Sequence, residues 1–266
     1  MPFVESAGAR IHWESQGTGT PVLLIMGHVL SSRMWAPLLP ALTQQHRAIR
    51  FDNRGTGESD TTRAASIGQF AADALAVLDA AGERRAHVYG VSMGGAIAAE
   101  FAMRYPDRVA SLVLGCTMMK TAAGSRAPWI ARLLYYLPSG LVRTLLRSRA
   151  AYGSAAPAEA VDADLKLLAG ERFTMAGARA QAAAMANYVT TPEAVGRLAM
   201  PTLVLHGDED GAVDVRHGRE LAAAIPGSRL VIFAGAGHNY LVAAGAASTA
   251  AVLDFFAEVD RTPREA

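Results

Sequence analysis

The chain has 266 residues, of which 51% are hydrophobic and 18% are charged. This composition is too apolar for a disordered protein, and the length is sufficient for one α/β domain with a complete core. The 25 basic and 24 acidic residues leave a formal net charge of +1, which gives no general electrostatic reason to expect binding to nucleic acid or to an anionic membrane.

The cysteine content and the apolar segments narrow the class of protein further. A single cysteine, Cys116, excludes an intrachain disulfide and a metal cluster of several cysteines. The N-terminal segment lacks the basic and apolar regions of a secretory signal. No uninterrupted apolar run reaches the ~18–20 residues of a membrane-spanning helix. We therefore expect a cytoplasmic protein without a membrane span.

Short β-branched or aliphatic runs alternate along the chain with segments of helical period, which predicts an α/β protein with a mostly parallel sheet. The chain opens with a predicted hairpin, in which strands at 2–6 and 11–15 flank a turn at 7–9. Further strands are predicted at 22–26, 48–52, 87–90, 109–114, 202–206 and 229–233. Helices are predicted at 70–81, 92–104, 215–224 and 248–259.

The stretch from about residue 120 to residue 198 interrupts this alternation. It is rich in predicted helix, is punctuated by prolines and shows no obvious strand. We interpret residues 120–198 as a helical cap, or lid, inserted before a later strand of a single core domain. That core would comprise residues 1–119 and 199–266.

The strongest chemical signal is the sequence Gly90-Val91-Ser92-Met93-Gly94. It follows an apolar strand and opens a helix of small residues, which is the context of a G-x-S-x-G nucleophile elbow. Glycines two residues either side of Ser92 avoid β-carbons that would collide across the turn, and the helix N-terminus directs free amides such as that of Met93 toward developing negative charge. The alternative is a glycine-rich helix cap with an inert serine.

With this elbow, the chain resembles the α/β-hydrolase superfamily over nearly its whole length. Residues 51–60 resemble the D-x-R-G-x-G-x-S-D loop of that family. Residues 205–210 resemble the strand and turn that deliver its catalytic acid, and residues 235–238 the turn that delivers its histidine. The resemblance implies an α/β-hydrolase fold, with a mostly parallel central sheet flanked by helices and a helical lid inserted before the acid-bearing strand.

The resemblance also assigns a base and an acid to the nucleophile Ser92. Among seven histidines, His238 occupies the glycine-rich loop after the last strand. We expect His87 and His206 to have structural roles, and His12, His46 and His217 to lie at the surface. The family pattern G-x-x-D starting at Gly207 selects Asp210 as the acid, whereas Asp208, Glu209 and Asp214 in the same loop are interpreted as turn-forming or solvated.

Two backbone amides are expected to form the oxyanion hole. One belongs to Met93, and alignment of the family pattern on Gly27 makes His28 the second. The His28 side chain could contact substrate or serve the structure. Asp52 and Arg54 are expected to brace the loop beneath the site through backbone hydrogen bonds and an ion pair.

The resemblance implies a serine hydrolase for esters, lactones or thioesters of a small molecule, without a metal or an organic cofactor. Residues 25–27, 51–60 and 237–240 look most like those of small bacterial esterases near polyketide-tailoring methylesterases and enol-lactonases. Alternatives with the same triad are a cofactor-free perhydrolase or haloperoxidase, a C–C bond hydrolase, and an acyl cyclase with an internal acceptor. A ligand receptor without hydrolytic activity is an alternative of another class.

The predicted lid has an unusual charge pattern. Residues 121–158 contain no Asp or Glu but include five arginines, interleaved with large apolar residues. One interpretation is an amphipathic lid with solvated arginines. The other is a substrate pocket for a hydrophobic group, with arginines that attract a carboxylate-bearing substrate or an acidic carrier protein. The pocket residues would be Trp129, Leu133, Tyr136 and Leu137.

Overall fold

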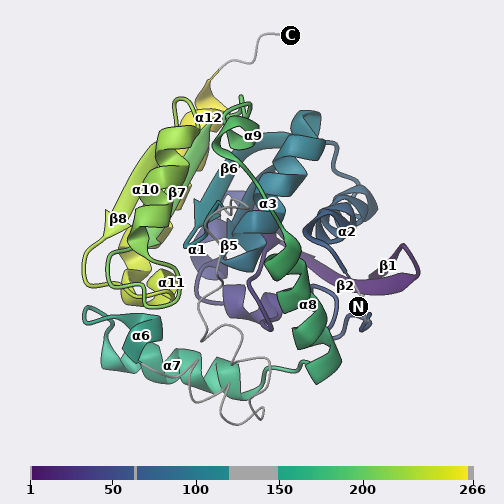
Figure 1. Ribbon diagram of the computed structural model, residues 1–266, viewed down its shortest axis with the longest axis horizontal. Helices are drawn as coiled ribbons and strands as arrows, with labels where there is room; N and C mark the ends of the chain where they lie inside the picture. Colours follow the sequence, from purple (N-terminus) through teal and green to yellow (C-terminus); the bar gives the residue numbers. More distant parts are fainter. Residues whose placement is uncertain (1, 63–64, 120–148, 263–266) are drawn as a thin grey trace.

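The computed structural model describes residues 2–62, 65–119 and 149–262, and within these ranges eight strands form one sheet (Figure 1). The strand order is β1-β2-β4-β3-β5-β6-β7-β8. Only β2 among them is antiparallel to both of its neighbours. Each predicted strand overlaps an observed one. The strands are β1 (Phe3–Ser6), β2 (Ala9–Gln16), β3 (Thr20–Ile25), β4 (His46–Phe51), β5 (Ala86–Val91), β6 (Val109–Gly115), β7 (Thr202–Gly207) and β8 (Arg229–Phe233).

The predicted N-terminal hairpin is confirmed by the pairing of β1 with β2. Its two turn residues, Ala7 and Gly8, both have positive φ angles, of 43° and 74°. Two successive positive φ angles give a two-residue turn the twist that matches antiparallel strands.

Helices cover both faces of the sheet, so the parallel strands are buried on both sides. Every residue of β5, β6 and β7 is buried, as expected for such strands. In β3 the side chains of Leu23 and Ile25 join the core on one face, whereas those of Val22 and Leu24 join the core on the other. The first face carries α2 (Ile67–Ala80), α3 (Met93–Arg104) and α10 (Val215–Ala224), and the second carries α1 (Leu39–Leu42) and α12 (Gly245–Arg261).

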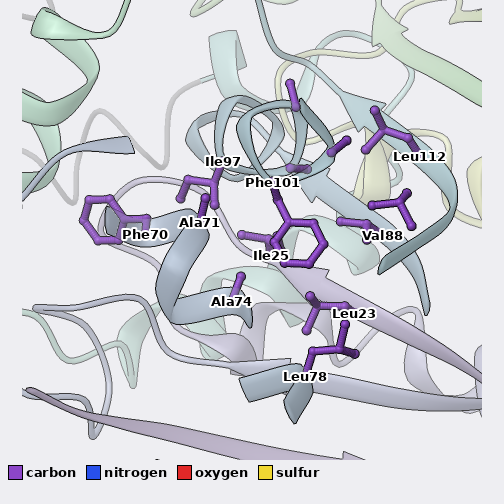
Figure 2. Packing of buried hydrophobic residues seen from close by; sticks show 14 of the residues in the cluster. Leu23, Ile25, Phe70, Ala71, Ala74, Leu78, Val88, Ile97, Phe101 and Leu112 are labelled. Atoms are coloured by element: carbon purple, nitrogen blue, oxygen red, sulfur yellow. The ribbon is translucent and has the colours of Figure 1, made fainter. Parts of the chain in front are cut away.

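The core on the first face forms where α2 and α3 pack against each other and against the central strands (Figure 2). Ser66 is the N-cap of α2, and its hydroxyl oxygen accepts a hydrogen bond from the backbone N–H of Gln69 at 3.1 Å. The side chains labelled in Figure 2 are those of Leu23, Ile25, Phe70, Ala71, Ala74, Leu78, Val88, Ile97, Phe101 and Leu112.

The segment between β6 and β7 contributes helices but no named strand in its described part. α6, α7 and α8 lie together along the lower side of the molecule, opposite the C-terminus (Figure 1). The helices are α6 (Arg149–Tyr152), α7 (Ala158–Ala169), α8 (Met175–Asn187) and α9 (Pro192–Val195). Short elements elsewhere are the 3-10 turns η1 (Ser32–Trp35) and η2 (Pro106–Arg108) and the helix α11 (Tyr240–Ala243).

Two histidines expected at the surface are instead buried. The ring of His12 packs beside Phe3, and its Nδ1 lies 3.1 Å from Oδ2 of Asp52. His46 begins β4 and packs edge-on against Phe256 of α12, with ring centroids 5.6 Å apart. Both positions are covered by segments distant in the sequence, which a local pattern does not show.

No helix in the described parts of the chain has the length and apolar character that crossing a membrane requires.

Candidate active site

Ser92 occupies a strained turn between β5 and α3. Its φ and ψ angles are 56° and −122°, a conformation that non-glycine residues rarely adopt. The turn is held by the N–H of Ser92, which donates to the carbonyl oxygen of Gly115 at 2.8 Å. It also requires glycine at two places: a β-carbon at Gly90 would lie 2.0 Å from the Gly94 oxygen, and one at Gly94 would lie 2.1 Å from the Ile25 oxygen. The sequence therefore forces a strained turn that fixes the half-buried Ser92 hydroxyl.

His238 lies in the loop after β8 and reaches the Ser92 hydroxyl. Its Nε2 is 3.0 Å from Oγ of Ser92, and its Nδ1 is 2.8 Å from Oδ2 of Asp210. An ionised Asp210 accepts the Nδ1 proton, which leaves Nε2 as the acceptor for the serine proton. The arrangement is that of a nucleophile, a base and an acid that orients the base.

Asp210 is buried in the turn after β7 and receives several hydrogen bonds. Its Oδ1 accepts from the backbone N–H groups of Ala212 and Val213, each at 2.8 Å. Its Oδ2 lies 3.2 Å from Nε2 of His206 as well as near His238. Burial by itself raises the pKa of Asp210, but the hydrogen bonds from the two histidines outweigh it and hold that pKa below its ordinary value. The carboxyl is therefore ionised at neutral pH.

The other carboxylates of this loop have different partners. Asp208 accepts from the N–H of Gly235 at 2.6 Å. Glu209 accepts from the N–H and the hydroxyl of Ser154. Asp214 is the N-cap of α10, and its Oδ1 accepts from the backbone N–H of Arg216. The structure thus brings Asp210 to His238 and assigns the other three to turns and caps.

The His238 imidazole has a perturbed pKa. Burial lowers this pKa, whereas the adjacent Cys116 and the Asp210 carboxylate raise it, and the balance lies well above the ordinary value. Cys116 is buried immediately after β6 and has a positive φ of 40°. Neither the contact of Cys116 with the candidate base His238 nor that of His206 with the candidate acid Asp210 is predicted from the sequence. The spacing of four residues between His206 and Asp210 was the available sequence signal for the contact between these two residues.

The loop after β3 brings Gly27 next to Ser92, and His28 follows it in the chain. A β-carbon added to Gly27 would lie 3.1 Å from Cβ and 3.7 Å from Oγ of Ser92. Met93 is the first residue of α3, where a backbone N–H has no acceptor within its own helix. Both expected oxyanion donors thus belong to backbone segments that adjoin the candidate nucleophile.

The His28 side chain contacts the inserted segment. Its Nε2 donates to the carbonyl oxygen of Ala178 in α8 at 3.0 Å. Burial lowers the pKa of His28, against a smaller opposing effect of that carbonyl, so the ring is a neutral donor at neutral pH. Gln181 of α8 also fixes the loop after β3, because its Oε1 accepts from the N–H of Val29 at 2.8 Å. Its Nε2 donates to the backbone carbonyl oxygen of Arg54, in the loop after β4.

Asp52 and Arg54 brace the loops below Ser92. Asp52 accepts from the N–H groups of Ser32 at 2.8 Å and Glu58 at 3.0 Å. Arg54 forms a buried ion pair with Asp73 of α2. These contacts hold neighbouring loops together.

The candidate pocket residues Trp129, Leu133, Tyr136 and Leu137 lie outside the described residues. So do four of the five arginines that the lid interpretation uses, and the side chain of the fifth, Arg149, is not described. These predictions therefore rest on sequence alone.

One group of metal-ligand side chains occurs in the described part of the chain, formed by His46, His87 and Asp260. It lies where β4 and β5 begin, at the opposite end of the sheet from Ser92. The His87 ring bonds to protein groups at both nitrogens, with Nδ1 2.7 Å from Oγ of Ser111 and Nε2 3.1 Å from Oδ1 of Asp260. Both ring nitrogens of His87 are therefore satisfied within the protein, whereas Nδ1 of His46 has no hydrogen-bond partner among the described residues.

Comparison with known proteins places these features in context. The family model described as alpha/beta hydrolase fold matches residues 20–242. A protein of Azorhizobium caulinodans named as a carbamate hydrolase, RutD, is 28% identical over 98% of this chain and 100% of its own. A pimeloyl-[acyl-carrier protein] methyl ester esterase of Aliivibrio salmonicida is 26% identical over 86% and 88%. The solved enol-lactonase of Burkholderia xenovorans LB400 superposes with a TM-score of 0.83 at 26% identity, covering 96% and 100%.

Proposed function

Because the chain belongs to the α/β-hydrolase family and is an enzyme of that fold, we propose that it is a serine hydrolase. The proposed reaction cleaves an ester, lactone or thioester of a fairly hydrophobic small molecule through an acyl-enzyme on Ser92. The observation that carries the proposal is the continuous hydrogen-bonded chain from Asp210 through His238 to Ser92, with separations of 2.8 and 3.0 Å.

The chemistry follows from the roles of these groups. His238 Nε2 takes the Ser92 proton as Oγ attacks the carbonyl carbon, and the resulting oxyanion is held by the N–H groups of His28 and Met93. His238 then protonates the leaving oxygen or sulfur. In the deacylation half-reaction, His238 takes a proton from water as the water oxygen attacks the acyl carbon. The bond from that carbon to Oγ of Ser92 then breaks, and His238 returns the proton to Oγ, which releases the acid and regenerates Ser92.

The relatives support attack at an acyl carbon that carries a heteroatom. Their names refer to a carbamate, a methyl ester and an enol-lactone, which share that feature. We propose that residues 120–198 form a cap over the carboxyl ends of the strands. Hydrogen bonds from α8 to the loops after β3 and β4 support this division.

The test begins with a fluorophosphonate label and a panel of p-nitrophenyl esters, methyl esters and lactones, each assayed with water and with hydrogen peroxide as acceptor. Ser92→Ala should abolish labelling, and Ser92→Ala and His238→Ala should each reduce kcat by about 10³–10⁶-fold. Ser15→Ala, at an exposed strand serine, is the matched control. A wild-type protein that takes neither label nor substrate would favour a receptor.

The acid assignment has its own control in the same loop. Asp210→Asn should lower kcat by about 10³–10⁴-fold, since the amide no longer stabilises the imidazolium or its productive tautomer. Asp208→Asn should keep near wild-type turnover, because Asp208 bonds to Gly235. The reverse pattern of activities would show that the acid is misassigned.

A further inference from the structure

The loop that carries His238 is hydrogen-bonded to the inserted segment on both sides of that residue. The N–H of Gly237 donates to the oxygen of Tyr152 at 2.9 Å, and the N–H of Asn239 donates to the oxygen of Ala151 at 2.6 Å. A third bond runs from the N–H of Ala155 to the oxygen of Gly235 at 2.8 Å.

The two segments touch backbone to backbone. Gly153 has a φ of 79°, and a β-carbon there would lie 2.3 Å from the Gly235 oxygen and 2.5 Å from the Gly237 nitrogen. No side chain therefore separates the backbone at Gly153 from the backbone of the His238 loop. Since the catalytic loop contains two glycines, its conformation depends on these external contacts.

Asp164 of α7 ties the same two segments together through side chains. It is 2% exposed, and its Oδ2 accepts from the Tyr152 hydroxyl at 2.7 Å and from Nδ2 of Asn239 at 2.9 Å. Burial raises the pKa of Asp164, and these two donors only partly oppose that effect. A buried carboxylate is costly unless it is hydrogen-bonded, and the two donors here come from the inserted segment and from the loop that carries His238.

We propose that Asp164 is a positioning residue for His238. Through its hydrogen bonds to Asn239 and Tyr152, Asp164 fixes the His238 imidazole relative to Ser92. This rests on the proposed function, because His238 is a base only there. Docking of α6 and α7 would then determine whether the triad is aligned, and a displacement of about 1 Å can cost on the order of 10²-fold in rate.

The geometry allows the positioning role of Asp164 to be tested separately from the effect of its negative charge. Both donors bond to one oxygen, so a neutral acceptor of the same shape suffices. Asp164→Asn keeps that acceptor, whereas Asp164→Leu removes it at similar volume. Asp162, which is exposed on the same helix, provides the matched control Asp162→Leu.

The kinetic test measures kcat and KM separately for p-nitrophenyl butyrate. Asp164→Leu should lower kcat by about 10–100-fold with KM within about threefold of wild type. Asp164→Asn and Asp162→Leu should stay within about threefold in kcat. A folded Asp164→Leu variant with wild-type kcat would overturn the proposal, as would an Asp164→Asn variant as impaired as Asp164→Leu.

A readout without turnover keeps this test distinct from the proposed function. The proton on Nδ1 of His238, bonded to Asp210, should give a downfield imidazole NMR resonance in wild type. Asp164→Leu should broaden or shift this resonance, whereas Asp164→Asn should retain it. If Asp164→Leu fails to fold, Asn239→Ala and Tyr152→Phe each remove one donor, and unchanged resonances and kcat in both would contradict the proposal. Inactivity of wild type with an intact resonance would refute only the hydrolase function.

Discussion

At the scale of single residues, the surroundings of Asp210 explain how one carboxyl remains charged inside the protein. Two backbone N–H groups and two imidazoles surround it, and together they lower its pKa despite burial. His206 is the less expected donor: it is fully buried, its Nε2 also lies 2.8 Å from the Val213 oxygen, and its Nδ1 has no hydrogen-bond partner in the described chain. His206 therefore acts as a buried hydrogen-bond partner of the candidate acid.

The raised pKa of His238 predicts the pH dependence of the reaction. The base must be unprotonated, so kcat/KM should fall as the pH drops through the His238 pKa, with a midpoint above the ordinary value of about 6.5. Asp210→Asn removes a negative charge that favours the imidazolium, so the midpoint of its residual activity should move to lower pH. Profiles of kcat/KM from pH 5 to 9 measure both midpoints, and a variant midpoint equal to or above that of wild type would contradict this account.

At the scale of elements, the elbow at Ser92 is a structure that the local sequence is sufficient to predict. Gly90, Ser92 and Gly94 were recognisable because strand, turn and helix are adjacent in the chain. The turn residues of the hairpin and the N-cap Ser66 of α2 are equally local, and the strands they adjoin fell close to the predicted positions. By contrast, the loop after β3 is held by Gln181, which lies 152 residues from Val29.

The close packing of the elbow predicts a strong effect of one methyl group. Gly94→Ala should destabilise the protein by about 4 kcal/mol or more and abolish activity, because the new β-carbon meets the backbone of β3. Gly82→Ala is the matched control: Gly82 has a φ of 76° but no atom within 4 Å of an added β-carbon. Its cost should be only about 1–2 kcal/mol, from backbone strain. Urea unfolding measures both, and equal costs would mean that backbone strain, not contact with β3, limits substitution.

At the scale of the whole molecule, the candidate site lies where loops from several strands meet the inserted segment. Ser31 after β3 donates to Glu171, and Gly57 after β4 donates to the carbonyl oxygen of Arg172. The loops after β7 and β8 contact residues 151–155. The inserted segment is therefore anchored to the loops that carry the candidate acid, the base and one proposed oxyanion donor.

The arginine-rich sequence of residues 121–158 predicts a salt-dependent preference among substrates. If these arginines attract an anionic substrate, kcat/KM for a carboxylate-bearing ester should fall by about tenfold between low and high salt, while a neutral ester of equal length should change little. Arg132→Ser combined with Arg143→Ser should reduce this difference. Equal salt responses for the two esters would leave the arginines as solvated lid residues.

The sequence by itself determined the order of strands and helices, the elbow at Ser92 and the positions of His238 and Asp210. These depend on short-range patterns: alternation, glycine where a β-carbon cannot fit, and motifs at fixed spacing. The family pattern also favoured Asp210 over Asp208, Glu209 and Asp214 as the acid, whereas the local sequence misplaced His12 and His46 at the surface.

Only the tertiary structure decided which groups meet. It brought Asp210 within 2.8 Å of His238, buried His46 under Phe256, and joined Asp164 to Asn239 across 75 residues. The physical reason is that hydrogen bonds and burial depend on distance in space, which chain folding sets. A residue's local sequence carries no record of the partner that folding brings to it.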